Sequence, residues 1–329
     1  DLLKIIRWEY KLVSYKLDSV GKKFLNAGKD PITPRDIFDA YQEGLVITDE
    51  LLEKRKRICD YCVQDCALVQ ELNDSLCLLL NNMQMGAVCS TPLHDILFRG
   101  QGIKLFSLVC KYCKNQGYIM KENKKKFNGN NRYEGAIVLE PHVGFYTHPI
   151  IVCDFNSLYP SCMRDCNYSP DCLIVDNKYR KLKGVEYKSC SYQDLDDEGI
   201  PMVNEDTSEP VMVTYTWAQP KAGGILPQIL TFLLDERNAA KKAMKNTKDP
   251  MMKMVYNGKQ LSYKVAMNSI YGQTGAPTSS FYCKPVAACT TSEGRKQILF
   301  SKKYVEDNYE GAVVVYGDTD SIMVKFNTG

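Results

Sequence analysis

The stretch that most limits the fold of this chain lies near its C-terminal end, where residues 311–326 read GAVVVYGDTDSIMVKF. An uninterrupted apolar and β-branched run at residues 312–316 is followed by turn residues at 317–320, and apolar and polar residues then alternate as far as Phe326. This pattern predicts a β-hairpin whose first strand is buried. Pairing of the two strands would hold the side chains at the tip in a fixed geometry.

The hairpin tip carries two carboxylates one residue apart, Asp318 and Asp320, followed by Ser321. Crowded carboxylates repel one another, and their hard oxygen atoms suit Mg²⁺, or Mn²⁺ in its place, with water and substrate phosphate completing the shell. Aspartate is also a common turn former for local hydrogen-bonding reasons alone. Taken by itself, the tip leaves a metal site and a plain polar turn equally open.

Two further segments favour the metal site. Residues 153–161, CDFNSLYPS, place Asp154 directly after a second apolar run that is expected to be a buried strand, with Tyr159 and Pro160 closing a turn. Residues 264–272, KVAMNSIYG, lie between this segment and the hairpin. The three motifs, in the order DxxSLYPS, KxxxNSxYG and YGDTDS, resemble the polymerase signatures of the family B DNA polymerases, as found in eukaryotic polymerase delta and in large DNA viruses of eukaryotes.

The resemblance implies a multi-domain α/β chain. It would begin with the end of an RNase H-like 3′-5′ exonuclease domain and continue with an α+β palm, built on an antiparallel sheet, and a helical-hairpin fingers domain. The thumb domain of the family would be absent. The expected divisions are the exonuclease part at 1–82, a connector at 83–136, the first part of the palm at 137–224, the fingers at 225–276 and a truncated second part of the palm at 277–329.

For the palm, the resemblance implies two-metal phosphoryl transfer. Asp154 and Asp320 would bridge two Mg²⁺ ions, the backbone carbonyl of Phe155 would be a further ligand, and Asp318 would be a supporting carboxylate. The ring of Tyr159 would lie beneath the sugar of the incoming deoxynucleoside triphosphate and exclude a 2′-hydroxyl. Further contacts to the triphosphate would come from the backbone N–H groups of Asn156, Ser157 and Leu158.

A helical hairpin is predicted over residues 225–271, broken at Pro250. Polar side chains recur at helical spacing on each of its helices, so each set forms a stripe. A solvated charged face would show the same spacing, but by resemblance these stripes hold the incoming triphosphate and the nascent base pair. The stripe residues are Arg237 and Lys241 on the first helix, and Lys264, Asn268 and Tyr271 on the second.

The palm region is expected to contain strands at residues 171–176 and 211–217, with an acidic stretch at 194–209 between them. Such a stretch would repel DNA and is expected to face away from it. A helical pattern at 290–304 then leads the chain to the hairpin.

The segment 133–136, YEGA, resembles the motif that lies between the exonuclease and polymerase domains of the family and touches the template. Tyr133 and Gly135 are the residues expected to contact DNA. A basic stretch over residues 124–132 precedes them. Most such runs are solvated loops, but beside this motif it would suit contact with DNA phosphates.

Residues 1–82 are predicted to be mainly helical, with a loop at 27–35 and the clearest helix over 57–80. On that helix Tyr61 and Asp65 lie four residues apart and hence on one face. From spacing alone they read as surface residues, but they resemble the YxxxD motif of the proofreading exonuclease. No other carboxylate motif of that exonuclease precedes Asp65, so the chain is expected to begin inside the domain and not to proofread.

Composition sets weaker limits. With 44% hydrophobic and 25% charged residues the chain is ordinary for a soluble globular protein, and its net charge of +3 is too small to identify a nucleic-acid partner. We expect an intracellular protein, in the nucleus or at a site of viral replication, with no membrane-spanning segment.

The pairs Cys59/Cys62 and Cys110/Cys113 have zinc-knuckle spacing, but packing as small hydrophobes is favoured for the first pair.

By resemblance, the partners would be primer-template DNA and deoxynucleoside triphosphates, with a sliding clamp or accessory subunits in a full-length protein. Two other functions remain open. A catalytically inactive family B paralogue could serve as a DNA-binding or scaffolding subunit, although it need not retain Asp154, Asp320, Lys264 and Tyr159. An RNA-making polymerase is disfavoured by Tyr159.

Overall fold

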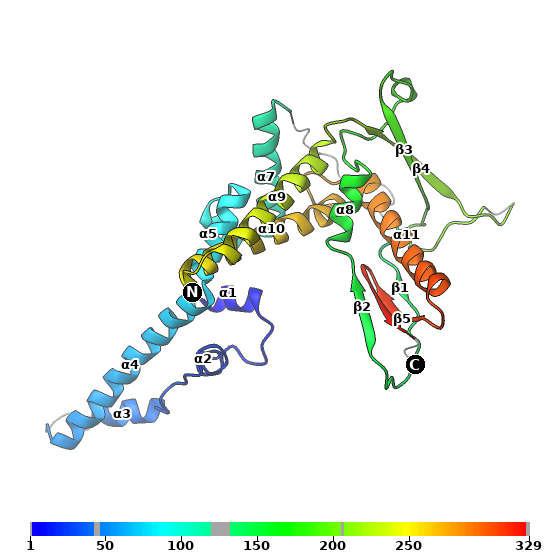
Figure 1. Cartoon of the computed structure of the whole chain (residues 1–329). Helices are drawn as coiled ribbons and strands as arrows, with labels where there is room; N and C mark the ends of the chain where they lie inside the picture. The colour runs from blue at the N-terminus through cyan, green and yellow to red at the C-terminus, as the bar shows by residue number, and fades with distance from the viewer. Residues whose placement is uncertain (1, 43–46, 120–131, 205–206, 327–329) are drawn as a thin grey trace.

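The structure is a computed structural model that describes residues 2–42, 47–119, 132–204 and 207–326. Figure 1 shows an arm of N-terminal helices on one side, a pair of long antiparallel helices across the middle, and two sheets beside a further long helix on the other side. No described helix combines the length and the apolar composition needed to cross a lipid bilayer.

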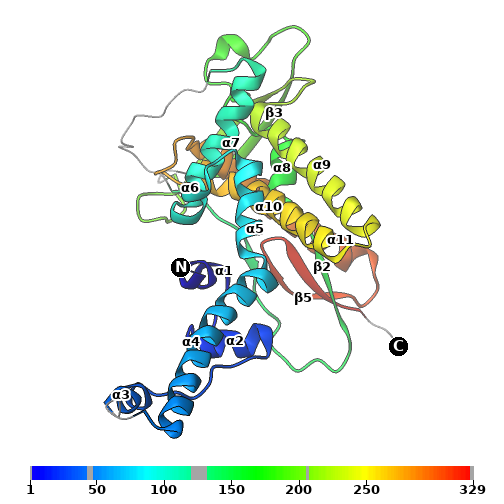
Figure 2. The ribbon, with the colours of Figure 1, turned by 90° about the vertical axis from the view of Figure 1, so that its left-hand side faces the viewer.

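Residues 1–82 are mainly helical, as predicted, and the helices continue through the first part of the expected connector as far as Gln116. They are α1 (Leu2–Glu9), α2 (Leu17–Leu25), α3 (Pro34–Gln42), α4 (Asp49–Leu76), α5 (Leu78–Cys89), α6 (Leu93–Phe98) and α7 (Gln101–Gln116). The side-chain oxygen of Thr48 accepts a hydrogen bond from the N–H of Leu51 and caps the start of α4. Cys77, with a left-handed φ of 51°, divides the helix predicted at 57–80 into α4 and α5, which follow one another in Figure 2.

The rest of the chain builds two antiparallel sheets and several helices. The helices are α8 (Leu158–Asp165), the short 3-10 helix η1 (Asn177–Tyr179), α9 (Ile225–Asn246), α10 (Pro250–Gly275) and α11 (Lys284–Asn308). The strands are β1 (Val138–Leu139), β2 (Ile150–Asp154), β3 (Glu186–Gln193), β4 (Met212–Gln219), β5 (Val313–Asp318) and β6 (Ser321–Lys325). One sheet has the order β1-β5-β6-β2, and β3 pairs with β4 in the other.

The predicted hairpin is confirmed as β5 and β6 at the centre of the four-stranded sheet. The prediction that the strand before Asp154 is buried is wrong, because Ile151 and Val152 are 50% and 57% exposed. β2 is an edge strand, and among the described strands it pairs only with β6. An apolar run of this kind indicates burial only where other elements cover both faces of the strand.

The strand predicted at 211–217 is confirmed as β4, whereas the one predicted at 171–176 is wrong. This segment forms no strand, although Leu173 makes an isolated bridge to Trp217 of β4, flanked by backbone hydrogen bonds from Ile174 to Thr216 and from Ala218 to Cys172. The side chain of Asp176 accepts a backbone hydrogen bond that starts η1, and this turns the chain away. The partner of β4 is instead β3, which the sequence does not predict because polar residues on its exposed face obscure the alternation.

The helical hairpin predicted at 225–271 is confirmed as α9 and α10. The side chain of Asp249 accepts a hydrogen bond from the N–H of Met251 and caps the start of α10, while Pro250 occupies the first turn, where its missing N–H costs nothing. The helix predicted at 290–304 is confirmed within the longer α11.

α11 lies between two hydrophobic cores. The larger core joins the helical hairpin to the β3-β4 sheet and includes Trp217, Leu230 and Ile270, all with 0% exposure. The smaller core lies under the four-stranded sheet. Cys289 of α11 belongs to the larger core and Ile298 to the smaller one, so this helix fixes the carboxylate hairpin relative to the helical hairpin.

Candidate active site

Sheet pairing brings the three candidate carboxylates to one place. Asp154, the last residue of β2, lies opposite Ser321 of β6, and Asp318, the last residue of β5, lies opposite the same Ser321. The N–H of Phe155 donates a 2.8 Å hydrogen bond to the backbone carbonyl of Asp320. Segments that are far apart in the sequence therefore meet at one end of the sheet.

The electrostatics of this end of the sheet favour a cation. Burial raises the pKa of Asp320, and the negative charges of Asp154 and, to a smaller extent, Asp318 raise it further. In the part of the chain that the structure describes, no three His, Cys, Asp or Glu side chains are grouped closely enough to hold a metal by themselves. Two carboxylates completed by backbone, water and phosphate oxygens are nevertheless a donor set that suits Mg²⁺ or Mn²⁺.

The segment after Asp154 turns sharply into α8. Ser157 adopts a left-handed backbone with φ of 53°, and α8 begins at the next residue, Leu158. The prediction that Tyr159 and Pro160 close a turn is therefore wrong, since both lie in the first turn of α8. The backbone N–H groups at the beginning of a helix lack intrahelical partners, so this turn offers donors beside the carboxylates.

Two predicted nucleotide-binding tyrosines are in contact although they come from different helices. The ring of Tyr159 on α8 lies 4.5 Å from that of Tyr271 on α10, centroid to centroid, with the planes at 44°. Tyr133, the predicted template contact, lies close enough to Tyr271 that its hydroxyl also helps to raise the pKa of Tyr271. Burial is the largest cause that raises the pKa of Tyr159 and of Tyr271, so both remain neutral phenols. Three motifs thus meet in one aromatic cluster.

The basic side chains of the two stripes converge on each other. The positive charge of Arg237 is the largest cause that lowers the pKa of Lys241, and Lys264 on the facing helix contributes in the same direction. Lys264 and Asn268 are exposed on α10. A set of mutually repelling cations that reach the surface could hold a polyanion such as a triphosphate.

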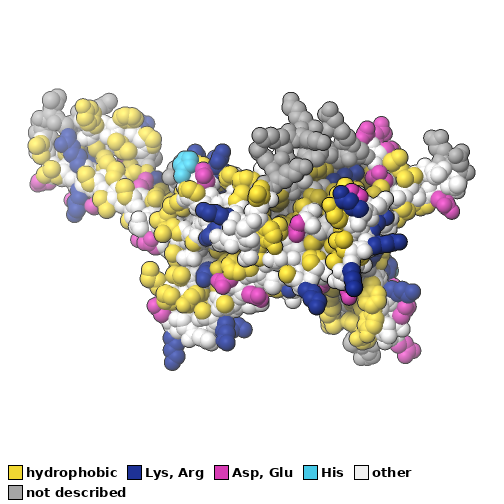
Figure 3. Space-filling model, turned by 90° about the horizontal axis from the view of Figure 1, so that it is seen from above, with side chains coloured by type: hydrophobic (Ala, Val, Ile, Leu, Met, Phe, Trp, Pro, Cys, Tyr) yellow, Lys and Arg dark blue, Asp and Glu magenta, His cyan; other side chains and the backbone are white. Residues whose placement is uncertain are grey.

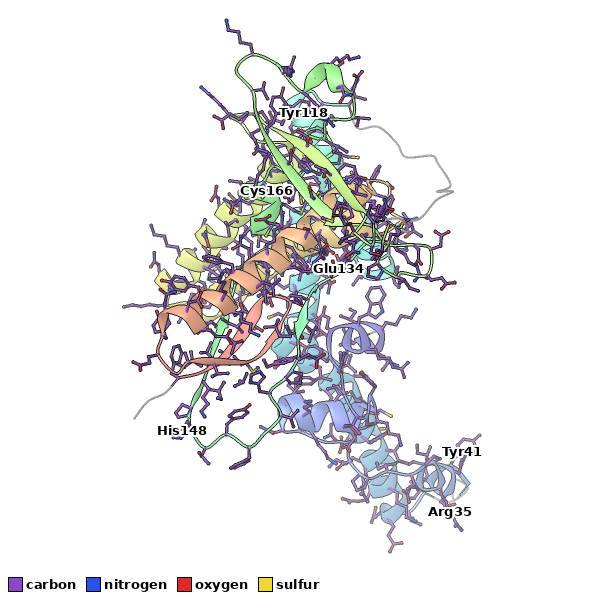
Figure 4. The ribbon with its side chains drawn as sticks, turned by 90° about the vertical axis from the view of Figure 1, so that its right-hand side faces the viewer. Arg35, Tyr41, Tyr118, Glu134, His148 and Cys166 are labelled. Atoms are coloured by element: carbon purple, nitrogen blue, oxygen red, sulfur yellow. The ribbon has the colours of Figure 1, made fainter. Side chains whose placement is uncertain are left out.

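Arg295 of α11 binds the predicted template segment, although no sequence motif points to it. Its guanidinium donates hydrogen bonds to the backbone carbonyls of Glu134 and Gly135, at 2.7 and 2.6 Å. Figure 4 labels Glu134, which lies beside α11. The predicted template segment is thus attached to the helix below the aromatic cluster. The sequence offers one weak sign of this role, a single arginine in a helix that is otherwise rich in small residues. The role itself cannot be predicted, because the partners of Arg295 are distant in sequence.

Tyr61 and Asp65 lie on one face of α4, as their spacing predicts, and both contact Lys29. The ammonium of Lys29 lies 2.5 Å from a carboxylate oxygen of Asp65 and 4.9 Å from the ring centroid of Tyr61. The other carboxylate oxygen of Asp65 is buried without a hydrogen-bond partner. In Figure 1, α4 and the four-stranded sheet lie on opposite sides of the molecule, so this pair does not belong to the carboxylate site.

Other predicted features fall outside the site. Cys59 and Cys62 are exposed on α4, so the expectation that they pack as small hydrophobes is wrong. The basic stretch at 124–132 lies outside the described residues except for Arg132, whose guanidinium donates to the carbonyl of Glu198 in the acidic stretch. On the face shown in Figure 3, acidic and basic side chains are interspersed, in keeping with the small net charge.

Comparison with known proteins agrees with these motifs. A model of DNA polymerase family B matches residues 91–329. The DNA polymerase of Pyramimonas orientalis virus is 34% identical over 99% of this chain and 35% of its own length. The DNA polymerase delta catalytic subunits of Arabidopsis thaliana and Caenorhabditis elegans are 37% and 35% identical, each over 99% of this chain and 28% of their own length.

A solved family B DNA polymerase from the archaeon Pyrobaculum calidifontis matches the fold with a TM-score of 0.67 at 24% identity, over 100% of this chain and 39% of that one. The chain therefore spans about a third of the length of the relatives it matches. The family match and the level of identity lead to one conclusion: this chain belongs to the family B DNA polymerases.

Proposed function

We propose that this chain forms the catalytic and nucleotide-binding part of a polymerase that adds deoxynucleoside triphosphates to a primer 3′-hydroxyl on a DNA template. The observation that carries the proposal is the meeting of Asp154 and Asp320 at one end of the sheet, beside the Tyr159/Tyr271 pair. The four-stranded sheet with α8 and α11 would be the palm, at 137–224 and 277–329. The helical hairpin at 225–276 would be the fingers.

In this proposal Asp154, Asp320 and the carbonyl of Phe155 hold the metals, and Asp318 supports them from the end of β5. Two bound Mg²⁺ ions would activate the attacking hydroxyl and neutralise charge on the departing pyrophosphate. The raised pKa of Asp320 fits such a site, because the repulsion between the carboxylates is relieved when cations bind.

The triphosphate would lie between the turn at the start of α8 and the exposed stripes of the helical hairpin. Arg237 can bind phosphate oxygens with its planar fork, whereas Lys241 and Lys264 act as point charges. The N–H groups of Asn156, Ser157 and Leu158 would donate from the opposite side. Tyr159 would exclude ribose by its bulk, and the nascent base pair would pack against Tyr271, with Asn268 behind it.

Primer-template DNA would enter on the side of Tyr133 and Gly135. The part at 1–82 would belong to an exonuclease domain in which Tyr61 and Asp65 are motif residues, and 83–136 would connect it to the palm. We further propose that the longer protein acts in DNA replication, in the nucleus or at a viral replication site, and that a sliding clamp or accessory subunits are its partners.

The test is primer extension by the full-length polymerase that carries this chain, with Asp154→Asn and Asp320→Asn as variants. Each should lower the rate of extension by at least about a thousandfold, since loss of charge at a two-metal site removes transition-state stabilisation. Asp307→Asn, at an exposed position near the end of α11, is the matched control and should keep the rate. Extension at control levels by either site variant would refute the proposal.

A further inference from the structure

Gly294 of α11 lies directly against the ring of Tyr159. A Cβ atom added to this buried glycine would lie 2.8 Å from Cε1 and 3.4 Å from Cδ1 of Tyr159, and 3.5 Å from Cδ2 of Leu158. A Cβ atom does not come as close as 2.8 Å to an atom that is not bonded to it. The ring therefore rests on the backbone of α11, and a side chain at position 294 would push the ring away from the helix.

Arg295, the next residue, joins α11 to the segment that carries Tyr133. Its side chain is only 11% exposed, and its Nη2 atom lies 2.9 Å from the carboxylate of Glu134. Its Nη1 atom donates to the carbonyls of Glu134 and Gly135, and the hydroxyl of Thr291 donates to the same carbonyl of Glu134 at 2.8 Å. A guanidinium matches three such acceptors because its donors form a rigid fork, which an ammonium lacks.

The contacts that start at Gly294 form a closed chain that returns to α11 at Arg295. Gly294 supports Tyr159, whose ring packs on Tyr271. Tyr271 interacts with the hydroxyl of Tyr133, and the residues after Tyr133 are bound by Arg295. The positions of all three tyrosines therefore depend on two adjacent residues of α11.

We propose that Gly294 and Arg295 are positioning residues that set the sugar selectivity of the enzyme through Tyr159. The inference rests on the proposed role of Tyr159 in excluding ribose. Gly294 fixes how far the ring extends from α11 towards the nucleotide. Arg295 supports the ring indirectly, because it anchors the segment whose Tyr133 interacts with Tyr271.

The two residues act in opposite directions, which gives the test its contrast. The measured quantity is the ratio of kcat/KM for a deoxynucleotide to that for the matching ribonucleotide, in the full-length polymerase. Gly294→Ala should raise this ratio at least about threefold, since it pushes the ring towards the sugar, whereas Arg295→Ala should lower it by a similar factor. Arg295→Lys should restore part of the ratio, because an ammonium reaches one of the carbonyls.

Two controls separate positioning from a general loss of structure. Gly144→Ala, at a glycine whose added Cβ would meet nothing within 4 Å, should leave the ratio unchanged. In a Tyr159→Ala background, Gly294→Ala should have no effect on the ratio, because the ring that transmits the change is gone.

If Tyr159→Ala changes the ratio but the variants of Gly294 and Arg295 do not, the positioning role is overturned while the proposed role of Tyr159 stands. Equal losses of kcat/KM for both sugars would also overturn it, since they would show a merely structural contribution. If Tyr159→Ala itself leaves the ratio unchanged in an enzyme that extends primers, both the role of Tyr159 and the inference built on it fail.

Discussion

The ring centroids of Tyr159 and Tyr271 lie 4.5 Å apart, although Tyr159 belongs to α8, which follows β2, and Tyr271 belongs to the helical hairpin. Contact of this kind ties the position of the hairpin to the floor of the proposed sugar site. Any movement of α10 relative to α8 would therefore change the space that a bound sugar meets.

Replacing Tyr159 with a smaller side chain should admit ribonucleotides. In the full-length enzyme, Tyr159→Val should lower the kcat/KM ratio of deoxynucleotide to ribonucleotide by at least about tenfold, because the exclusion is steric, and each factor of ten corresponds to about 1.4 kcal/mol. Tyr159→Phe is the control and should keep the ratio, since it keeps the ring. An unchanged ratio in a Tyr159→Val variant that still extends primers would refute the role of Tyr159 in excluding ribonucleotides.

Lys264 should act on the nucleotide and not on the DNA. Lys264→Ala should raise the KM for the deoxynucleotide by about tenfold or more, because a cation of the proposed triphosphate site is lost. Primer-template affinity, measured by gel shift, should stay close to that of the parent enzyme. Lys253→Ala, an exposed lysine on the same helix, serves as the control. Equal weakening of nucleotide use and DNA binding would make Lys264 a general DNA contact.

Without a bound cation, the charged carboxylates of the proposed site should lower the free energy of unfolding. Burial and the charge of Asp154 raise the pKa of Asp320 in the folded state. Asp320 therefore contributes fully to stability below the pKa that it has in the unfolded chain, and this contribution is lost as the pH rises through its raised pKa in the folded state. Asp320→Asn should therefore have a higher Tm than the parent chain at pH 7 in EDTA. The difference should shrink as the pH falls towards 4, and thermal unfolding between pH 4 and 8 checks it. A lower Tm of the variant at pH 7 would contradict the account.

The sequence predicts those parts of the fold whose signals are local. Alternation and turn residues identify the β5-β6 hairpin, and Pro250 with its cap Asp249 identifies the break between α9 and α10. The exposure of β2 is not predictable, because an edge strand and a central strand carry the same apolar run until the sheet order is known. The division of the long helix at Cys77 is equally hidden, because a non-glycine residue in the left-handed region gives no sequence signal.

Motifs similarly identify side chains but not their supports. Asp154, Lys264 and Tyr271 are found because each lies in a long pattern, and the structure brings the patterns together. Arg295 is not found, because its partners are carbonyl groups far away in the sequence, and a backbone acceptor leaves no residue type to search for. Lys29 beside Asp65 escapes for a related reason, since it lies in a loop without periodicity.

The most direct test of the proposed metal site is the binding of Mn²⁺ to this chain together with a deoxynucleoside triphosphate, measured by electron paramagnetic resonance. We predict that the chain binds Mn²⁺ at the Asp154/Asp320 pair, and that Asp154→Asn and Asp320→Asn each weaken this binding at least about tenfold, because each removes one of the charged ligands. Asp307→Asn should bind Mn²⁺ like the parent chain. Equal Mn²⁺ affinity in the parent chain and in both site variants would contradict the account.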